Sequence, residues 1–473
     1  MKKHLSRQER VIGMSSDRRT VLTLIGAAMA SGAGCLSGMG WREGDSVFDE
    51  YDAPTFPQTD FVTDPDISPT VAADQVRGNI DFSLALLDQL RDGVADDENL
   101  FVSPYSVSVA LAMTYAGARG ETAAEMAAAL RYDLEDDDLH AAFGALETEL
   151  EQRNRDGQEV EQHGAEDSDE TDALGYQLSS ANAVWAAEEF PFADDYLDLL
   201  EAYYEAGDHT VDFAGDPDAA REEINTWVEA QTNDRIEDLL SEQDVRPSTR
   251  LVLTNAVYFL AAWEHDFDPD GTEPAPFTGL DGTESEVEMM HQSTQLRYAD
   301  IGGHQLVELP YANDDTSMVV ILPAEGEFES FEASLTADRL AIMLDEATYP
   351  VVDLALPKFG IESRFGLRNV LRELGMERAF DGDSADFSGM LEADDSDLSI
   401  TSVIHETFIE VDEEGTEAAA ATAVVMGGDD DGGQPDSVSM TVDRPFLFYI
   451  RDQPTETPLF LGRVVDGRSL QEE

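Results

Sequence analysis

The chain has 473 residues, with 28 lysines and arginines against 101 aspartates and glutamates, which gives a formal net charge of −73 at pH 7. This charge excludes a nucleic-acid-binding protein that works by neutralising phosphates. Hydrophobic residues make up 42% of the chain and aromatic residues 8%, enough to build a large core. In dilute buffer so many carboxylates would repel one another strongly, whereas molar salt shortens the Debye length to ~3 Å and screens this repulsion. The composition therefore indicates a halophilic protein.

Residues 1–35 carry the pattern of an export signal. Arg18 and Arg19 precede an apolar stretch, as in twin-arginine signals, and this stretch is too short and too rich in Gly and Ala for a membrane-spanning helix. Cys35 is the only cysteine, which excludes an internal disulfide. We expect Cys35 either to be a lipid anchor at the outer face of the cell membrane or to be an incidental residue of a removed signal. Both interpretations predict an exported, extracellular protein.

The rest of the chain divides into a tether and one large domain. Residues 36–74 are polar and acidic without an apolar period, and we expect a disordered tether there. Residues 75–473 are expected to form a single α+β domain, because helical patterns come first and strand patterns follow. Within it, about residues 154–173 are nearly all polar and acidic, which predicts a solvated loop between helices.

Local signals place several helices and strands in this domain. Ser103-Pro104 predicts a helix start, Thr122–Glu125 a capping box, and the apolar spacing of Ile224–Leu240 one continuous helix. Arg250–Leu260 is apolar on both faces, which predicts a central strand covered on both sides. The other predicted strands are His304–Pro310, Ser317–Pro323, Val351–Phe359, Ser402–Val411, Phe446–Ile450 and Leu459–Val465.

The common signatures of catalytic and metal sites are absent from the sequence. It contains no His-Glu-x-x-His, Walker loop, Gly-x-Gly-x-x-Gly or Gly-x-Ser-x-Gly motif. The carboxylates are too numerous for a glycosidase pair to stand out. His405 lies mid-strand among apolar neighbours, which favours a hydrogen-bonded core histidine over a catalytic base. We therefore expect no enzyme, no catalytic residue, no metal and no cofactor.

Many segments, in order along about 390 residues, resemble the serpin family of protease inhibitors. They include Asn99–Ser106, Ile224–Val228, Asn255–Phe259, Glu308–Tyr311, Pro357–Phe359, Pro445–Phe448 and Phe460–Val464. The resemblance is to an exported, haloarchaeal-type member, and it implies helices plus three β-sheets with an exposed reactive-centre loop at about residues 413–440. Departures from the family pattern are Leu260-Ala261 for Lys-Gly, Glu406 for Lys and Arg444 for His. Residues 131–175 are acidic where some serpins bind heparin, so no heparin-like polyanion is expected as a partner.

The resemblance implies that the start of this loop is a hinge, exposed in the native state, that inserts into the main sheet after cleavage. Its residues are Glu413, Glu414, Gly415, Thr416, Glu417, Ala418, Ala419, Ala420, Ala421 and Thr422. A period of two places the small side chains of Thr416, Ala418 and Ala420 on the inward face, whereas Glu417 lies on the other face. An inserting strand must carry no charge on its inward face, because burying an unpaired charge is costly. The alternative is a flexible, alanine-rich surface loop.

The implied function is suicide inhibition of a serine protease, either subtilisin-like or trypsin- or chymotrypsin-like, by a monomeric inhibitor. The acyl-enzyme forms on the loop and is trapped when the loop inserts. Family spacing from Glu413 places the scissile bond at Asp429–Asp430, whereas the preference of subtilisin-like proteases for apolar residues favours Met426–Gly427. The alternative function is that of a non-inhibitory serpin-fold binding or structural protein at the cell surface.

Overall fold

The computed structural model describes residues 46–57, 68–95, 97–134, 136–157, 176–188, 192–204, 209–313, 315–392, 398–416 and 437–470. The chain divides into two units, Met1–Glu43 and Gly44–Glu473, and all described residues belong to the second unit. The predicted export signal and Cys35 therefore lie outside the described residues.

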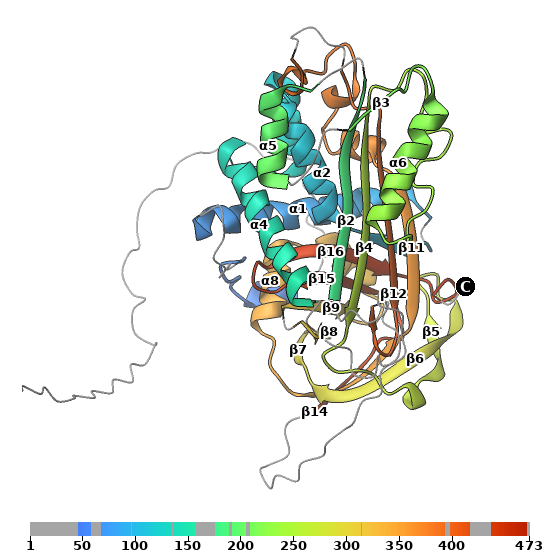
Figure 1. Ribbon diagram of the computed structural model, residues 1–473. Helices are drawn as coiled ribbons and strands as arrows, with labels where there is room; N and C mark the ends of the chain where they lie inside the picture. Colours follow the sequence, from blue (N-terminus) through green and yellow to red (C-terminus); the bar gives the residue numbers. More distant parts are fainter. Residues whose placement is uncertain are drawn as a thin grey trace, which may run out of the picture. The chain divides into compact units, whose positions relative to one another are not determined.

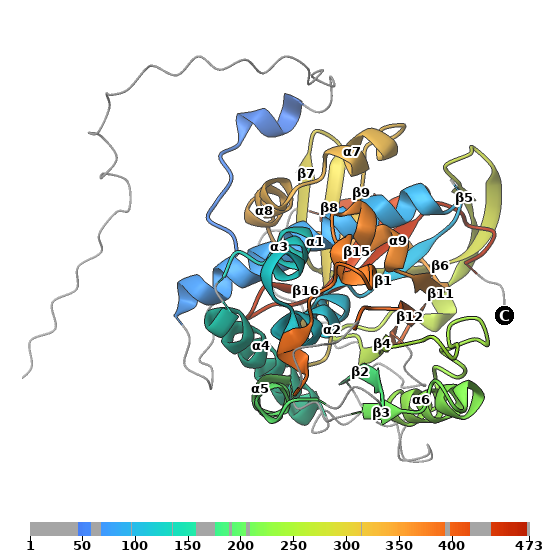
Figure 2. The same cartoon turned by 90° about the horizontal axis from the view of Figure 1, so that it is seen from above.

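Most of the helices in the first half of the chain gather on one face of the sheet that contains β2 (Tyr176–Ala187) and β4 (Leu251–Ala262), and α6 covers the opposite face (Figures 1 and 2). The α-helices are α1 (Pro69–Gly93), α2 (Pro104–Gly117), α3 (Gly120–Leu130), α4 (Asp136–Gly157), α5 (Asp194–Tyr204), α6 (Pro217–Gln231), α7 (Phe328–Ser334), α8 (Ala337–Asp345) and α9 (Arg368–Glu373). Short 3₁₀ helices are η1 (Ser46–Glu50), η2 (Pro269–Gly271), η3 (Arg378–Phe380) and η4 (Ser388–Met390). The helix start predicted at Ser103-Pro104 is confirmed, since the Ser103 hydroxyl accepts a hydrogen bond from the amide of Ser106.

Within the described ranges the strands form three sheets, which confirms the predicted α+β class with helices plus three sheets (Figure 1). The main sheet has the order β11 (Phe359–Gly366), β12 (Ser402–Val411), β13 (Gly415–Thr416), β4 (Leu251–Ala262), β2 (Tyr176–Ala187) and β3 (His209–Val211). A second sheet has the order β1 (Leu100–Val102), β16 (Thr457–Val464), β15 (Phe446–Asp452), β9 (Thr316–Leu322), β8 (His304–Pro310) and β7 (Arg297–Ile301). A four-stranded sheet has the order β14 (Ser437–Thr441), β10 (Val351–Pro357), β6 (Glu284–Gln295) and β5 (Glu273–Thr278).

Strand β4 lies between two cores, as its apolar pattern on both faces predicted. Leu251 to Ala261 are all buried. Leu253, Val257 and Phe259 face the large core shared with α1, α2 and the second sheet. Val252 and Ala256 face a smaller core closed by α6. Alternate side chains of this one strand thus pack into two different cores.

Three local predictions from the sequence are wrong. The helix containing Ile224 ends at Gln231, because Asn233, Asp234 and Asp238 adopt positive φ and the Asn225 side chain accepts a hydrogen bond from the amide of Leu240. The capping box does not form, since helix α3 begins at Gly120 and Thr122 instead accepts a hydrogen bond from the amide of Asp386. The predicted strand Val351–Phe359 is divided between β10 and β11, which belong to different sheets.

The described part of the predicted tether is packed on the domain, so the boundary at residue 75 is also wrong. Phe48 in η1 is buried, with its ring 5.9 Å from that of His304 and 6.3 Å from that of Phe331. Helix α1 begins at Pro69, where Ser68 caps it by accepting a hydrogen bond from the amide of Val71. A single aromatic anchor in a polar stretch produces no periodic signal, which is why the sequence pattern missed it.

The range predicted for the acidic loop, about residues 154–173, begins inside a helix. Helix α4 continues to Gly157, and the Asn154 side chain exchanges two hydrogen bonds of 2.8 Å with the backbone of Leu178 in β2. The next described element along the chain is the strand β2. Residues 158–173 lie outside the described residues.

Candidate functional site

The candidate site lies where the chain leaves β12 and turns back into the main sheet. The turn Asp412–Gly415 ends in the two-residue strand β13, which pairs with β12 through Val411 and Thr416. On its other side β13 pairs with β4, so that Gly415 lies opposite Ala262 and Thr416 opposite Ala261. The expectation that the whole hinge is exposed is therefore wrong for its first residues, because Gly415 and Thr416 are already strand residues of the sheet.

Glu413 is held by a lysine and a threonine from outside the loop. Its Oε2 lies 2.7 Å from Nζ of Lys358, and its Oε1 accepts a 2.6 Å hydrogen bond from the hydroxyl of Thr272. Partial burial would raise the pKa of Glu413, but the hydrogen bonds from Lys358 and Thr272 outweigh it and lower this pKa. The same contact raises the pKa of Lys358 against the opposite effect of its desolvation. Both groups are thus held in their charged forms.

Asp412 shapes the turn itself. Its Oδ1 accepts hydrogen bonds from the amides of Glu414 at 2.9 Å and Gly415 at 3.2 Å. Burial raises the pKa of Asp412 despite these two hydrogen bonds. Trp263 also fixes the turn, since its indole Nε1 donates to the carbonyl of Asp412 at 3.0 Å and its amide to the carbonyl of Glu414 at 2.9 Å. The backbone direction at the start of the hinge is therefore set by polar contacts from two sides.

Gly415 is required by close packing. A Cβ at this position would collide with the backbone oxygen of Ala261 and lie 2.8 Å from Cα of Ala262. Any side chain here would push β13 away from β4.

Thr416 points into the large core, in agreement with the inward face predicted for it. Its side chain is fully buried, and its hydroxyl lies 2.8 Å from the hydroxyl of Tyr311. The Tyr311 ring stacks on Trp263 with a centroid distance of 4.6 Å and an interplanar angle of 7°. Burial raises the pKa of Tyr311, so its hydroxyl stays protonated and available as a hydrogen-bond partner.

The other predicted site residues lie outside the described residues. These are Glu417, Ala418, Ala419, Ala420, Ala421, Thr422, Asp429, Asp430 and Cys35. Their assignment as hinge, reactive bond and lipid anchor stays a prediction. Sequence reasoning did not single out Lys358, Thr272 or Tyr311, although Lys358 carried one signal: it is the only lysine after Lys3.

The main sheet is only partly closed between β12 and β4. The two strands pair directly, in parallel, from Ser402 opposite Val252 to Thr407 opposite Val257. Beyond Thr407 they separate, and Thr416 fills the space between Val411 and Ala261. The sheet therefore holds a partly occupied strand position between β12 and β4.

The directly paired part of these strands contains a buried polar network. The imidazole of His405 donates from Nδ1 to the side-chain oxygen of Asn255, and its Nε2 accepts a 3.0 Å hydrogen bond from the amide of Ser103. Asn255 in turn donates to the Ser106 hydroxyl at 2.6 Å. Burial lowers the pKa of His405 to about 3, so the ring is neutral at physiological pH. This arrangement confirms a hydrogen-bonded core histidine.

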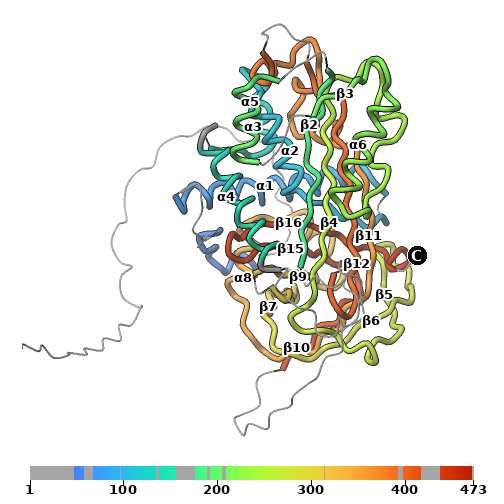
Figure 3. Tube along the Cα trace, in the orientation of Figure 1, coloured from blue at the N-terminus to red at the C-terminus, as the bar shows by residue number. Residues whose placement is uncertain are grey.

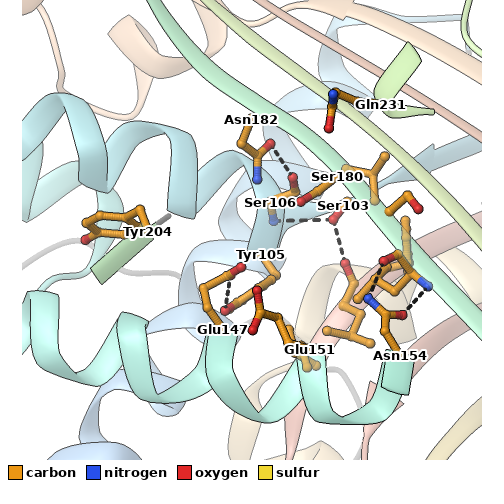
Figure 4. A pocket seen from close by; sticks show the side chains of 16 residues that line it. Ser103, Tyr105, Ser106, Glu147, Glu151, Asn154, Ser180, Asn182, Tyr204 and Gln231 are labelled. Carbon is orange, nitrogen blue, oxygen red and sulfur yellow. Dashed lines mark hydrogen bonds between the residues drawn. The ribbon is translucent and has the colours of Figure 1, made fainter. Parts of the chain in front are cut away.

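A polar cavity of about 370 Å³ adjoins this network between α2, α4 and β2 (Figure 4). Ser103, Ser106 and Asn182 line it on the side of the network, and Glu147 lines it from α4. Glu147 accepts a 2.6 Å hydrogen bond from the hydroxyl of Tyr105. The described ranges contain no cluster of His, Cys, Asp or Glu suited to hold a metal ion. In the same part of the chain no helix has both the length and the apolar character of a membrane span.

Comparisons with known proteins agree on one family. A family model described as "Serpin (serine protease inhibitor)" matches residues 77–467. An uncharacterized serpin-like protein of Thermococcus kodakarensis is 36% identical over 80% of this chain and 84% of its own length. Human serpin B3 is 35% identical over 81% of this chain and 97% of its own length.

Solved structures give the same result. The native thermophilic serpin tengpin superimposes with a TM-score of 0.72 at 29% identity, covering 90% of this chain and 100% of tengpin. Human thyroxine-binding globulin in complex with its ligand superimposes with a TM-score of 0.71 at 28% identity, covering 84% of this chain and 99% of the globulin. Figure 3 shows the described path of this chain as a Cα trace, coloured along the sequence.

Proposed function

The chain belongs to the serpin family, and from this premise we propose that it is a suicide-substrate inhibitor of serine proteases. In this proposal a protease cleaves the segment between β13 and β14 and forms an acyl-enzyme. The freed segment then extends β13 through the main sheet and carries the protease with it. The fold itself does not decide between inhibitory and non-inhibitory members.

The observation that carries the proposal is the register on the two sides of Thr416. If β13 continues antiparallel to both neighbours, Ala420 lies opposite Val257 on β4 and opposite Thr407 on β12. Val257 and Thr407 are already partners in the closed part of the sheet. An entering strand therefore meets both neighbours in one register without a slip.

The same register explains why the side chains of the hinge are small. Even-numbered residues follow Thr416 toward the large core, where Ala418 would face Phe259. Ala421 would face Ala256 in the core closed by α6. Around Ala421 the outward face would thus be covered by α6, and small or apolar residues would be required on both faces only there.

The register also bears on the scissile bond. Met426 would lie opposite Leu251, the first residue of β4, and Asp429 would lie three residues beyond that strand. We propose Asp429–Asp430 as the reactive bond, with Met426–Gly427 as the competing assignment. Asp429→Arg is expected to redirect inhibition toward trypsin. No trypsin inhibition by this variant, together with an altered target after substitution of Met426, would select the competing bond.

The experiment that tests the proposal is incubation of the full chain with a serine protease in molar salt, followed by denaturing gel electrophoresis and mass spectrometry. We expect a complex stable to SDS and a released C-terminal fragment whose mass gives the cleaved bond. Cleavage without a complex would contradict inhibition. That outcome would favour the second candidate, a non-inhibitory binding protein, for which the polar cavity beside α4 is the place to seek a ligand.

We further infer export, lipid anchoring through Cys35 and adaptation to high salt, all from the sequence. Arg18-Arg19 and Cys35 support the first two, and the net charge of −73 supports the third. Fractionation of cells producing the wild type and Cys35→Ser tests the anchor. Release of the variant alone into the medium is expected, and equal release of both proteins would contradict lipidation.

A further inference from the structure

Residues 232–250 form a connector between α6 and β4. We call the direct pairing of β12 with β4, from Ser402 to Thr407 on β12, the seam. The core closed by α6 contains Ile404 of β12 and Val252 of β4, one residue from each strand of the seam. It also contains the buried apolar residues of the connector, which are Ile236, Leu239, Leu240 and Val245. The connector therefore packs in one core with both strands of the seam.

Helix α6 fixes this connector on the β4 side of the seam. The amide of Leu240 donates to Oδ1 of Asn225 on α6 at 2.8 Å, and Nδ2 of Asn225 donates to the carbonyl of Leu240 at 3.0 Å. The ring of Trp227, also on α6, lies 5.5 Å from that of Trp185 on β2 and 5.1 Å from that of His209 on β3. Since β2 and β3 follow β4 in the main sheet, α6 and Leu240 belong with this half of the sheet.

Arg364 of β11 holds the same connector from the other side of the seam. Its Nη2 and Nε donate to the carbonyl of Leu239 at 2.7 and 3.2 Å, and its Nη2 lies 2.8 Å from Oδ2 of Asp244. Its Nε also lies 3.4 Å from Oε2 of Glu406, which is opposite Arg364 in the pairing of β11 with β12. A lysine, which the family pattern has at position 406, would repel Arg364 there. Arg364 therefore joins the half of the sheet formed by β11 and β12 to a segment that α6 fixes on the other half.

A strand that enters the seam would move these two halves apart by one strand spacing, ~4.8 Å. The hydrogen bonds of 2.7 and 3.2 Å between Arg364 and Leu239 must then break, unless α6 leaves its place on β2 and β3. We propose that Arg364 is a positioning residue that resists opening of the seam and thereby limits the rate at which the cleaved loop inserts, an inference that rests on the proposed function. Its contacts stabilise the closed sheet and are lost as the seam opens, so their removal accelerates insertion.

The test measures how fast a fluorescent synthetic peptide with the sequence of residues 417–426 enters the full-length protein in molar salt, without any protease. The proteins are the wild type, Arg364→Met, which keeps an unbranched side chain without donors, and Arg364→Lys, which keeps the charge. Native gels and the rise in melting temperature follow the uptake. We expect Arg364→Met to take up the peptide about fivefold faster than the wild type, the effect of losing hydrogen bonds from a partly exposed charged group. The rate for Arg364→Lys should lie between the two.

Arg368→Met is the matched control. Arg368 on α9 also donates to two backbone carbonyls, those of Thr401 and Phe380, each at 2.8 Å, but both acceptors lie between β11 and β12 in the chain, so neither bond crosses the seam. Its peptide uptake should equal that of the wild type even if its melting temperature falls. A difference of less than about twofold between Arg364→Met and the wild type, or an equal acceleration in Arg368→Met, would overturn the role of Arg364. If the wild type forms no SDS-stable complex with a protease that cleaves its loop, while Arg364→Met still takes up the peptide faster, the proposed function fails and the role of Arg364 stands.

Discussion

Nζ of Lys358 lies 2.7 Å from Oε2 of Glu413. This ion pair connects the residue at which the chain passes from one sheet to another with the first residue of the hinge. Lys358 stands between β10 of the four-stranded sheet and β11 of the main sheet. Glu413 stands between β12 and β13. The pair therefore ties together two chain turns at the same end of the main sheet.

Lys358→Met should release the base of the hinge, whereas Lys358→Arg should keep most of the contact. For a half-buried pair we expect a loss of about 1 kcal/mol in the free energy of unfolding. The pKa of Glu413 in the folded state lies below its ordinary value of 4.5. Its contribution to the free energy of unfolding is therefore fully present above pH 4.5 and is lost as the pH falls through the folded-state pKa. The raised pKa of Lys358 makes its contribution disappear only as the pH rises beyond its ordinary 10.5. Denaturant unfolding at pH 7 and pH 3 checks this, and an equal difference between Lys358→Met and wild type at both pH values would contradict it.

Tyr311→Phe removes only one hydroxyl group but should lower the free energy of unfolding noticeably. The substitution leaves the buried hydroxyl of Thr416 without its partner at 2.8 Å, a cost of about 1–2 kcal/mol. The double variant Tyr311→Phe with Thr416→Val removes both polar groups and should recover most of that loss. Equilibrium unfolding of the four proteins gives the coupling free energy. Strictly additive losses would show that the two hydroxyls do not interact.

Thr416→Arg should convert the proposed inhibitor into a substrate. An arginine at this position would place an unpaired charge in the core beneath Tyr311 and prevent β13 from holding its place. Glu417→Arg is the matched control, because a continuation of the β13 register past Thr416 would put residue 417 on the outward face beside the exposed Glu410. Gel assays with a serine protease should show loss of the complex in the first variant and little change in the second. Equal loss in both would refute the assignment of faces.

Glu406→Gln should change the pH dependence of stability. Burial raises the pKa of Glu406 to about 7, so the folded state takes up a proton and gains stability as the pH falls from 7 toward 4.5. The buried His405, with a pKa of about 3, gives the opposite slope below pH 6.5, because there the unfolded state binds more protons. The two effects oppose each other between about pH 4.5 and 6.5, at up to about 1.4 kcal/mol per pH unit each.

Removing the carboxylate should therefore expose the slope that His405 produces. We expect Glu406→Gln to be more stable than the wild type at pH 8 and to lose stability more steeply on acidification to pH 5. Denaturant unfolding at constant molar salt over this range checks both signs. Parallel pH profiles for the two proteins would contradict the compensation.

Low ionic strength should unfold the protein. With a net charge of −73, the repulsion between carboxylates grows as the Debye length rises from ~3 Å at 1 M salt to ~10 Å at 0.1 M. Thermal unfolding between about 0.1 and 3 M potassium chloride should show a steady rise in melting temperature. A melting temperature independent of salt would contradict the argument.

The sequence predicted those elements whose signals are local and repeated. β4 was identified from apolar residues on both of its faces, and the inward position of Thr416 from the period of two. β2 was missed because Tyr176–Ala187 is rich in Ser, Ala and Asn, which have low strand propensity; it is a strand because β4 pairs with it from Ala186 to Tyr176. The change of sheet at Lys358 and the contact between Tyr311 and Thr416 depend on residues far apart in the sequence. No local pattern could indicate them.

The place of Lys358 has a practical consequence for spectroscopy. Lysine occurs only at positions 2, 3 and 358, so reductive methylation with ¹³C-formaldehyde labels one side-chain amine in the folded domain. That amine is about one-third exposed and touches Glu413 at the base of the hinge. Its methyl resonance would therefore report on the hinge in solution, in molar salt and in the presence of protease, without any engineered probe.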